Sequence, residues 1–281
     1  MPSFVTGSPS RQNPSSAQDN LFDAAIDSGD VSEPRGLTVN LTPGPSTVID
    51  GRRILGVIPA RGGSRGLPGK NIASLGGRPL ISWTIAAAGG ADLIDRCIVS
   101  TDDPEIANAA RESGGEVPFM RPADLAADDT PGVDPILHAC DQIDGYDIVV
   151  MLQPTSPLRR SSDIDGAIRH MVGGGYRTCV SVVDTKHHPN WLVRVEDDGR
   201  LRRYDNKPLI PRRQDLPPIY ALNGAVYAAD VATLRRERTF LTNDTGAYVM
   251  PPDRSFDIDS VSDLRCCEAM LDGNVIDPEA G

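Results

Sequence analysis

Residues 54–71 read ILGVIPARGGSRGLPGKN, an apolar run followed by a loop rich in glycine and positive charge. The run from Ile54 to Ile58 predicts a buried strand, and the prolines and glycines after it exclude a regular helix or strand. Glycine lets a backbone come close to a ligand, and successive free N–H groups form an anion-binding concavity. Arg61, Arg65 and Lys70 add charge-assisted hydrogen bonds. The segment is therefore predicted to hold several phosphates at the end of a strand.

This loop departs from two common phosphate-binding motifs. Lys70 is followed by Asn71 rather than by Ser or Thr, and the G-x-G-x-x-G pattern is absent. The segment resembles the signature of the CMP-acylneuraminate synthetase family, I-P-A-R-G-G-S-K-G-(I/L)-x-x-K-N, whose members are cytidylyltransferases that activate sialic acid and related acid sugars. Every fixed position matches except Arg65, which replaces a lysine and keeps its charge. The resemblance covers roughly residues 53–272.

The resemblance implies an α/β fold, with a Rossmann-like, mostly parallel sheet sandwiched by helices and a small protruding dimerisation arm. Strands and helices that alternate along the chain favour the same architecture, in which ligands bind at the carboxyl ends of the strands. The expected strands are 54–58, 97–101, 117–120, 147–152, 178–183, 219–227 and 248–250, and the expected helices begin near Pro79, Asp103, Pro131, Ser161 and Ser262.

Composition limits the classes of partner. The chain has 281 residues, a hydrophobic content of 39% and a formal net charge of −11, which fits one large domain with appendages. The negative charge argues against nucleic acid and anionic membranes as partners, and no apolar segment is long enough to span a membrane. The N-terminus lacks a basic start followed by an apolar core, so no secretory signal is expected. Five cysteines without a C-x-x-C spacing indicate neither zinc nor a disulfide framework, which favours the cytoplasm.

Two regions differ in composition. Residues 1–50 are rich in Ser, Pro, Asp and Gly and are predicted to form a disordered N-terminal extension. A regulatory or partner-binding role for this extension stays open. Residues 51–275 are expected to form the cytidylyltransferase domain, with the arm at about residues 190–217.

The resemblance implies a nucleotide site on the first loop. Lys70 and Arg61 would be the catalytic residues, with Lys70 stabilising charge on the phosphates during transfer. The string from Arg121 to Asp128, RPADLAAD, resembles the family loop that lines the base pocket, so Arg121 would contact the cytosine edge or its ribose. Pairing of Arg121 with Asp124 is the structural alternative. The implied nucleotide-binding residues are Arg61, Gly62, Gly63, Ser64, Arg65, Lys70, Asn71 and Arg121.

Later strings imply an acceptor site. Residues 152–159, LQPTSPLR, match the family without a change, and their prolines hold the loop at small ordering cost. Residues 223–225 match the family's N-G-A string. In the arm a hairpin is predicted, followed by P-R-x-Q-x-L-P, which in the family reaches across a homodimer. The implied acceptor-binding residues are Gln153, Ser156, Arg213 and Asn223; simple turn residues and a solvated basic edge are the alternatives.

Asp257 and Asp259 are the predicted metal ligands. They belong to the family's D-I-D string, and alternation in an extended segment places both carboxylates on one side. Mg²⁺ prefers one or two carboxylates together with waters and substrate phosphates. The cofactor is therefore predicted to be Mg²⁺. The alternative is that these residues cap the final helix.

Together these features predict transfer of CMP from CTP to a small acidic acceptor, with release of pyrophosphate. Sialate synthetases commonly carry cations where this chain has Trp191 and Ala221, so the acceptor could be a related nonulosonic acid or a small phosphonate such as phosphonoformate. A non-catalytic nucleotide sensor is a further alternative. A glycosyltransferase would need a D-x-D after a central strand, whereas Asp163 and Asp165 fall in a helix start.

Overall fold

The computed structural model describes residues 49–64, 66–185, 187–204 and 207–272, so the predicted N-terminal extension lies almost wholly outside the described residues. The described strands are β1 (Ile54–Pro59), β2 (Ser74–Leu75), β3 (Arg78–Pro79), β4 (Arg96–Ser100), β5 (Ile148–Met151), β6 (Thr178–Asp184), β7 (Val193–Val195), β8 (Leu201–Arg203), β9 (Tyr220–Asp230) and β10 (Thr245–Met250). The α-helices are α1 (Leu80–Gly89), α2 (Pro104–Glu112), α3 (Asp134–Gln142), α4 (Ser161–Gly173), α5 (Val231–Glu237) and α6 (Val261–Asp272).

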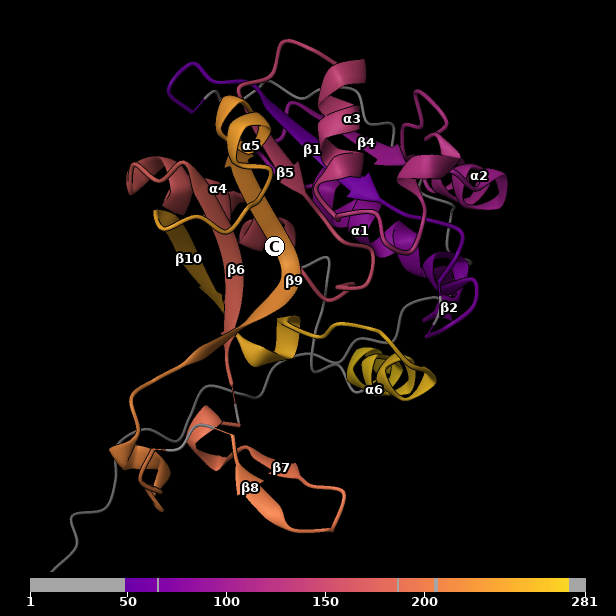
Figure 1. The fold of residues 1–281 in the computed structure, drawn as a ribbon. Helices are drawn as coiled ribbons and strands as arrows, with labels where there is room; N and C mark the ends of the chain where they lie inside the picture. Colours follow the sequence, from indigo (N-terminus) through magenta and orange to yellow (C-terminus); the bar gives the residue numbers. More distant parts are fainter. Residues whose placement is uncertain (1–48, 65, 186, 205–206, 273–281) are drawn as a thin grey trace, which may run out of the picture. The chain divides into compact units, whose positions relative to one another are not determined.

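A six-stranded sheet in the order β10-β6-β9-β5-β1-β4 forms the centre of the fold (Figure 1). β1 runs parallel to both β4 and β5, and β10 runs parallel to β6. β9 is antiparallel to its two neighbours, β5 and β6. The prediction of a mostly parallel sheet is thus confirmed, with β9 as the one reversed strand of this sheet.

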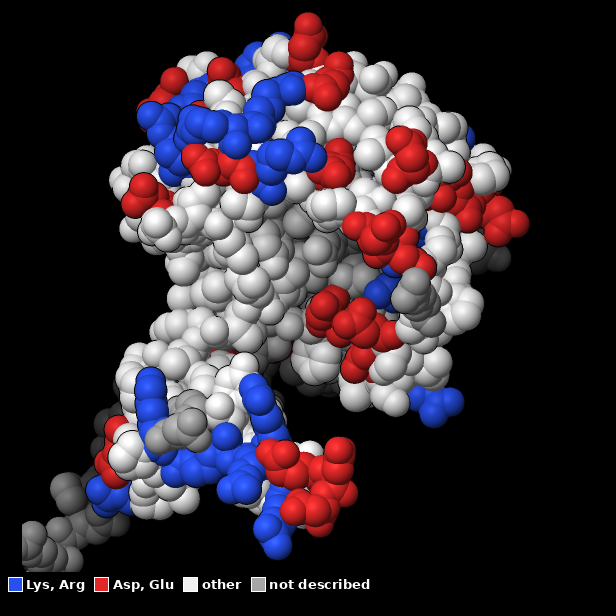
Figure 2. Space-filling view, in the orientation of Figure 1, with Lys and Arg blue, Asp and Glu red and all other residues white. Residues whose placement is uncertain are grey.

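The predicted hairpin of the arm is present. β7 and β8 pair antiparallel with each other in a separate two-stranded sheet, which follows β6 after the short helical turn Pro189–Trp191. Asn190 fixes the base of this arm, because its side chain donates to the carbonyl of Pro208 at 2.9 Å and accepts from the amide of Ile210 at 2.8 Å. Figure 2 shows that Lys and Arg side chains gather on the arm and over α5.

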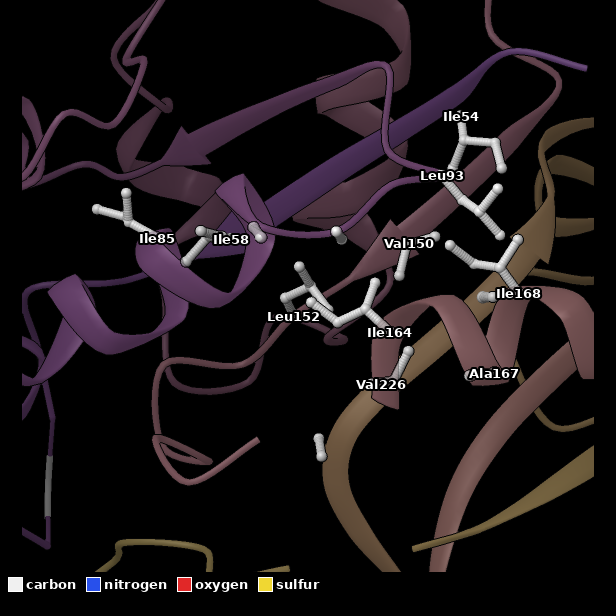
Figure 3. Packing of buried hydrophobic residues seen from close by; sticks show 14 of the residues in the cluster. Ile54, Ile58, Ile85, Leu93, Val150, Leu152, Ile164, Ala167, Ile168 and Val226 are labelled. Carbon is white, nitrogen blue, oxygen red and sulfur yellow. The ribbon is translucent and has the colours of Figure 1, made fainter. Parts of the chain in front are cut away.

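Helices cover both faces of the central sheet. The side chains of Ile54 and Ile58 point to one face and pack with α1, α2 and α4 (Figure 3), whereas Leu55 and Val57 point to the other and pack with α3 and α5. This alternation along a fully buried strand explains why β1 is apolar throughout. A third cluster around Ile258 packs α6 against the segment that precedes it.

Two element predictions need correction. Residues 117–120 do not form a strand. Two isolated parallel bridges occur here instead, Ile98 with Glu116 and Thr101 with Met120, and residues 117–119 between them are unpaired by strand hydrogen bonding. Pro118 has no N–H to donate, which explains why a continuous ladder does not form there. The helix expected from residue 131 begins three residues later, at Asp134. Among the described helices, none is long and apolar enough to cross a membrane.

Candidate active site

Three loops meet at one edge of the sheet. The glycine-rich loop follows β1, the turn into α2 follows β4, and residues 152–159 follow β5. Because β1 is parallel to β4 and β5, all three segments leave the sheet at the same edge. The expectation that the phosphate loop lies at the carboxyl ends of strands is borne out by this topology.

The phosphate loop is packed against two neighbouring segments. A Cβ on Gly62 would lie 2.5 Å from Oδ2 of Asp103, and a Cβ on Gly66 would lie 2.5 Å from the backbone oxygen of Asp259. Nothing lies within 4 Å of such an atom on Gly63. Gly62 and Gly66 are therefore required by packing, and Gly63 leaves open space for a ligand. Arg65 lies outside the described residues.

The other polar residues of the loop stabilise its shape. The side chain of Asn71 is buried and donates to the carbonyl of Arg61 at 2.9 Å. The amide of Ser64 donates to the carbonyl of Gly62 at 3.0 Å. The guanidinium of Arg61 pairs with Asp128 at 2.9 Å and donates to the carbonyl of Ala127 at 3.2 Å. Arg61 thus connects the phosphate loop to the loop that begins at Arg121.

Arg121 is 5% exposed and pairs with Asp102 at 3.1 Å, rather than with Asp124 as the structural alternative proposed. Burial lowers the pKa of the Arg121 guanidinium, and its hydrogen bond to Asp102 opposes that shift. The backbone amide of Arg121 donates to the carbonyl of Thr101 at 2.8 Å. The base-side loop is therefore fixed to the end of β4 by both main chain and side chain.

The D-I-D segment contacts two of these loops. The ammonium of Lys70 lies 3.0 Å from Oδ1 of Asp259, and the amide of Ile258 donates to the carbonyl of Thr155 at 2.8 Å. Ile258 is fully buried, whereas Asp257 and Asp259 are both exposed on the opposite side, as alternation predicted. The segment therefore carries its carboxylates between the phosphate loop and the loop after β5.

The cap of α6 is formed by other residues. The amide of Ser260 donates to Oδ2 of Asp263 at 2.8 Å, and the amide of Asp263 donates to Oγ of Ser260 at 3.3 Å. These reciprocal bonds form a capping box. No cap bond to the carboxylates of Asp257 or Asp259 is found in the described part of the chain, so the helix-cap alternative loses its main support.

The donor chemistry of this pair fits a divalent cation. Although Asp257 is exposed as a whole residue, partial burial of its carboxyl group raises the pKa of that carboxyl. The charge of Asp259 raises the pKa further, while a bond to Thr155 and the charge of Lys70 oppose the shift. A cation between two such carboxylates would relieve their repulsion. No cluster of three or more His, Cys, Asp or Glu side chains suited to a metal occurs within the described ranges. A site here would be completed by substrate phosphates and water, as Mg²⁺ prefers.

Gln153, Ser156 and Asn223 lie together beside the D-I-D segment. A Cβ on Gly224 would lie 2.9 Å from Oε1 of Gln153 and 3.5 Å from Oγ of Ser156, which explains the glycine at that place. Ser156 is fully buried, and its hydroxyl donates to the carbonyl of Asn223 at 3.3 Å. Gln153 is half-buried, so of the three it is the best exposed to a ligand.

The Asn223 side chain is buried and its amide groups are engaged within the sheet. Oδ1 accepts from Oγ of Ser181 at 2.6 Å, and Nδ2 donates to Oγ of Ser255 at 3.0 Å. The bond to Ser181 lies at the irregular pairing between β6 and β9, and the bond to Ser255 reaches the segment after β10. In this conformation Asn223 shapes the site wall, and its role toward an acceptor stays a prediction.

Arg159 lies behind the acceptor loop. Its guanidinium is fully buried and donates to the carbonyl of Gln153 at 2.9 Å, to the carbonyl of Ala225 at 3.0 Å and to Oγ1 of Thr84 at 2.8 Å. Burial lowers the pKa of Arg159 to about 10. The last residue of the 152–159 string therefore serves the sheet, where it holds the segment after β5, the strand β9 and the helix α1 together.

Arg213 lies apart from the other predicted residues. Its Nη2 donates to Oδ2 of Asp184 at 3.3 Å and to the carbonyl of Thr185 at 3.4 Å. It borders an open groove of about 430 Å³ at the base of the arm. Asp184, the partner of Arg213, lies opposite Tyr220 in the pairing of β6 with β9. Gly224, which contacts Gln153, lies four residues further along β9, a distance of about 13 Å. Within one chain, Arg213 is therefore not brought to Gln153.

Sequence reasoning missed the role of Asp102 and the contact of Thr155 with the D-I-D segment. Two acids, Asp102 and Asp103, precede the predicted helix, and the cap is made by Asp103, which accepts from the amide of Glu105 at 2.7 Å. The signal was present in the sequence, since two successive acids precede one helix and only one can occupy its N-cap. Thr155 carried no such signal, because it contacts a segment about a hundred residues away.

Comparisons with known proteins point in one direction. The chain matches the family model described as Cytidylyltransferase over residues 55–265. It is 35% identical to CMP-N,N'-diacetyllegionaminic acid synthase of Legionella pneumophila, over 79% of this chain and 97% of that protein. It is 34% identical to N-acylneuraminate cytidylyltransferase of Streptococcus agalactiae, over 74% of this chain but only 51% of that protein.

A more distant relative and one solved structure are also similar to this chain, and both are named as cytidylyltransferases or CMP-sugar-acid synthetases. Pseudaminic acid cytidylyltransferase of Campylobacter jejuni is 27% identical over 78% of this chain and 96% of its own length. A CMP:2-keto-3-deoxy-manno-octonic acid synthetase complexed with CTP superposes with a TM-score of 0.62 at 19% identity, covering 79% of this chain and 99% of the other. At that identity the structural match bears on the fold alone.

Proposed function

The chain belongs to the cytidylyltransferase family, and to the CMP-acylneuraminate synthetases within it, and from this premise we propose that it joins CMP to a nonulosonic acid. It is a CTP-dependent nucleotidyltransferase that releases pyrophosphate. The observation that carries the proposal is the position of the D-I-D segment. Its two carboxylates lie between Lys70 of the phosphate loop and Thr155 of the acceptor loop, where the α-phosphate would meet the acceptor oxygen.

The acceptor is proposed to be a sugar acid of the sialic, legionaminic or pseudaminic type. The relatives named above are synthases of such compounds. The phosphonate and nucleotide-sensor alternatives are not favoured by these similarities. The similarity to the legionaminic acid synthase extends over 97% of that protein, against 51% of the N-acylneuraminate cytidylyltransferase, and this favours a legionaminic-type acid over sialic acid itself.

The proposed mechanism depends on positioning and on charge neutralisation. The oxygen of an acceptor hydroxyl attacks the α-phosphorus of CTP in line, a P–O bond forms, the bond to pyrophosphate breaks, and the hydroxyl proton is released to water. Lys70 neutralises charge on the α- and β-phosphates, and Arg61 leaves Asp128 to bind the triphosphate. Arg121 holds the base side and Gln153 orients the acceptor. When bound by Asp257 and Asp259, Mg²⁺ would supply Lewis acidity at the phosphates.

We further propose that the enzyme is a homodimer formed through the arm. Large apolar side chains of the arm are exposed, including Val195 (74%) and Leu201 (64%). A two-stranded hairpin is marginally stable alone, and exposed apolar patches mark association sites. Pairing of two arms would cover these side chains. It would also offer a route for Arg213 of one chain to reach the acceptor of the other.

Since CTP is an intracellular nucleotide, we place the enzyme in the cytoplasm.

Pyrophosphate release tests the reaction. The purified full chain is incubated with CTP and MgCl₂ and one acceptor at a time: legionaminate, N-acetylneuraminate, pseudaminate, an octulosonate sugar or phosphonoformate. Release with a nonulosonic acid, and a CMP conjugate of matching mass, is the expected result. Release with phosphonoformate alone would replace the proposed acceptor class. CTP binding without release for any acceptor would support the sensor alternative instead. A reaction without acceptor measures background hydrolysis.

Light scattering on size-exclusion columns tests the dimer. The wild-type chain is expected to elute with twice the mass of one chain, and Leu201→Asp is expected to elute as a monomer. Leu241→Asp is the matched control, because Leu241 is also a half-exposed leucine but lies outside the arm. A monomeric wild type at micromolar concentration would contradict the proposal.

A further inference from the structure

The carboxylate of Asp102, at the end of β4, is shared by two loops of the site. Its Oδ1 accepts from the backbone amide of Gly62 at 3.3 Å and from Nη2 of Arg121 at 3.1 Å. One oxygen atom therefore contacts the phosphate loop on one side and the base-side loop on the other. Gly62 and Arg121 are 59 residues apart in the sequence, and Asp102 lies between them in the chain as well as in space.

Other contacts bring the two loops to this carboxylate. Gly62 lies so close to the neighbouring Asp103 that a side chain there would collide with it. The amide of Arg121 is held by the carbonyl of Thr101. The carboxylate of Asp103 is used to cap α2, since it accepts from the amides of Glu105 and Ile106. Of the two adjacent acids, Asp103 is therefore occupied by the helix cap, and Asp102 is available to bind the two loops.

The positive charges of Arg121 and Arg61 explain why the Asp102 carboxylate can lie next to a predicted triphosphate site. Arg121 is buried, its pKa is lowered by burial, and the nearby charge of Arg61 lowers it further. Asp102 compensates this buried cation. Because the charge of Arg121 is already matched, Arg121 is held as a directional hydrogen-bond donor and is not free to move toward the phosphates.

We propose that Asp102 is a positioning residue that fixes the phosphate loop and the Arg121 loop relative to each other, so that one nucleotide is recognised by base and triphosphate together. This inference rests on the proposed function, because it assigns Arg121 to the base side of CTP. Without the charge of Asp102, the Gly62 amide and Arg121 lose their common anionic acceptor, and both hydrogen bonds weaken. Arg121 can then turn toward the phosphates of any nucleoside triphosphate, and the preference for CTP falls.

Calorimetric binding of CTP and of UTP, each with MgCl₂, tests the inference without an acceptor. In the Asp102→Asn variant we expect CTP affinity to fall by about tenfold, the scale of one hydrogen bond to a charged group. We expect the ratio of CTP to UTP affinity to fall with it. Asp103→Asn is the matched control, because it makes the same charge change one residue away while asparagine still caps a helix. It should keep both quantities.

The affinity ratio distinguishes positioning from a general loss of structure. A lower melting temperature with an unchanged CTP/UTP ratio would overturn the inference, as would an unchanged CTP affinity. If Asp102→Asn fails to fold, Asp102→Glu keeps the charge but moves it by one methylene group, and the same loss of preference is expected. A wild-type chain that binds neither nucleotide would overturn the proposed function itself, and this inference with it.

Discussion

Lys70 and Asp259, 189 residues apart in the sequence, join their side chains at 3.0 Å. The two partners are unequally exposed, since 15% of the Lys70 side chain is accessible to solvent against 77% of the Asp259 side chain. The ammonium is therefore held in place by its surroundings, while the carboxylate can change partner when a cation or a phosphate arrives. This contact places a fixed positive charge beside the predicted metal ligands.

Replacement of Lys70 by Gln is expected to reduce the rate of pyrophosphate release by about 10²–10³-fold, the usual cost of removing one donor that stabilises transition-state charge. Steady-state kinetics with CTP and the best acceptor measure this change. Arg111→Gln is the control, since it removes one exposed cation from α2, outside the site. Activity within threefold of wild type in Lys70→Gln would rule out the assigned role.

Asp257 gives a prediction on pH and metal. Burial raises the pKa of its carboxyl above the ordinary 3.8, so the folded state binds more protons than the unfolded state between the two pKa values. The free energy of unfolding contributed by this group therefore falls as pH rises from 3.8 through the folded pKa. Without divalent metal at pH 7, Asp257→Asn should melt above wild type, because it removes a carboxylate whose charged form is disfavoured in the folded state.

Melting curves with EDTA and with MgCl₂ check this prediction. Magnesium should raise the melting temperature of the wild type by mass action and that of Asp257→Asn much less. Asp244→Asn removes an exposed carboxylate from the loop before β10 and should respond to magnesium as the wild type does. An equal magnesium response in all three proteins would remove Asp257 from the metal site.

Much of the fold could be predicted because its signals are local. The apolar run at Ile54, the acids before α2 and the glycines after α1 each specify an element from adjacent residues. The direction of β9 could not be predicted, since period-two alternation is the same in parallel and antiparallel strands. The wrongly predicted strand at residues 117–120 is a different error, because Pro118 in the sequence already argued against a regular strand there.

The site was predictable in its residue types more than in its contacts. The family strings identified Lys70, Arg121 and Asp259, but the partners of these residues lie on distant segments. Arg159 shows the limit most clearly. Nothing in its string tells that the guanidinium is buried against the carbonyls of Gln153 and Ala225, because burial depends on how β5, β9 and α1 pack together.

Gly66→Ala is expected to lower the rate of pyrophosphate release at least tenfold. The added Cβ would lie 2.5 Å from the backbone oxygen of Asp259, so the D-I-D segment or the phosphate loop must move, and shifts of about 1 Å can cost about 10²-fold in rate. Gly132→Ala is the matched control, because nothing lies within 4 Å of the added atom there. Equal rates in the two variants would show that the loop tolerates the displacement.

Arg254→Met is expected to lower the free energy of unfolding by about 3–5 kcal/mol, the cost of leaving a buried charge without its partner. Nε and Nη2 of Arg254 each donate to a carboxylate oxygen of Asp163 at 2.9 Å, and the Asp163 side chain is 1% exposed. Urea unfolding measures the change. Arg236→Met breaks only the surface pair with Glu237 and should cost less than about 1 kcal/mol. The double variant Asp163→Asn/Arg254→Met should regain part of the lost stability, because no buried charge then remains unpaired. If the double variant is no more stable than Arg254→Met, the loss comes from packing of the arginine stem instead.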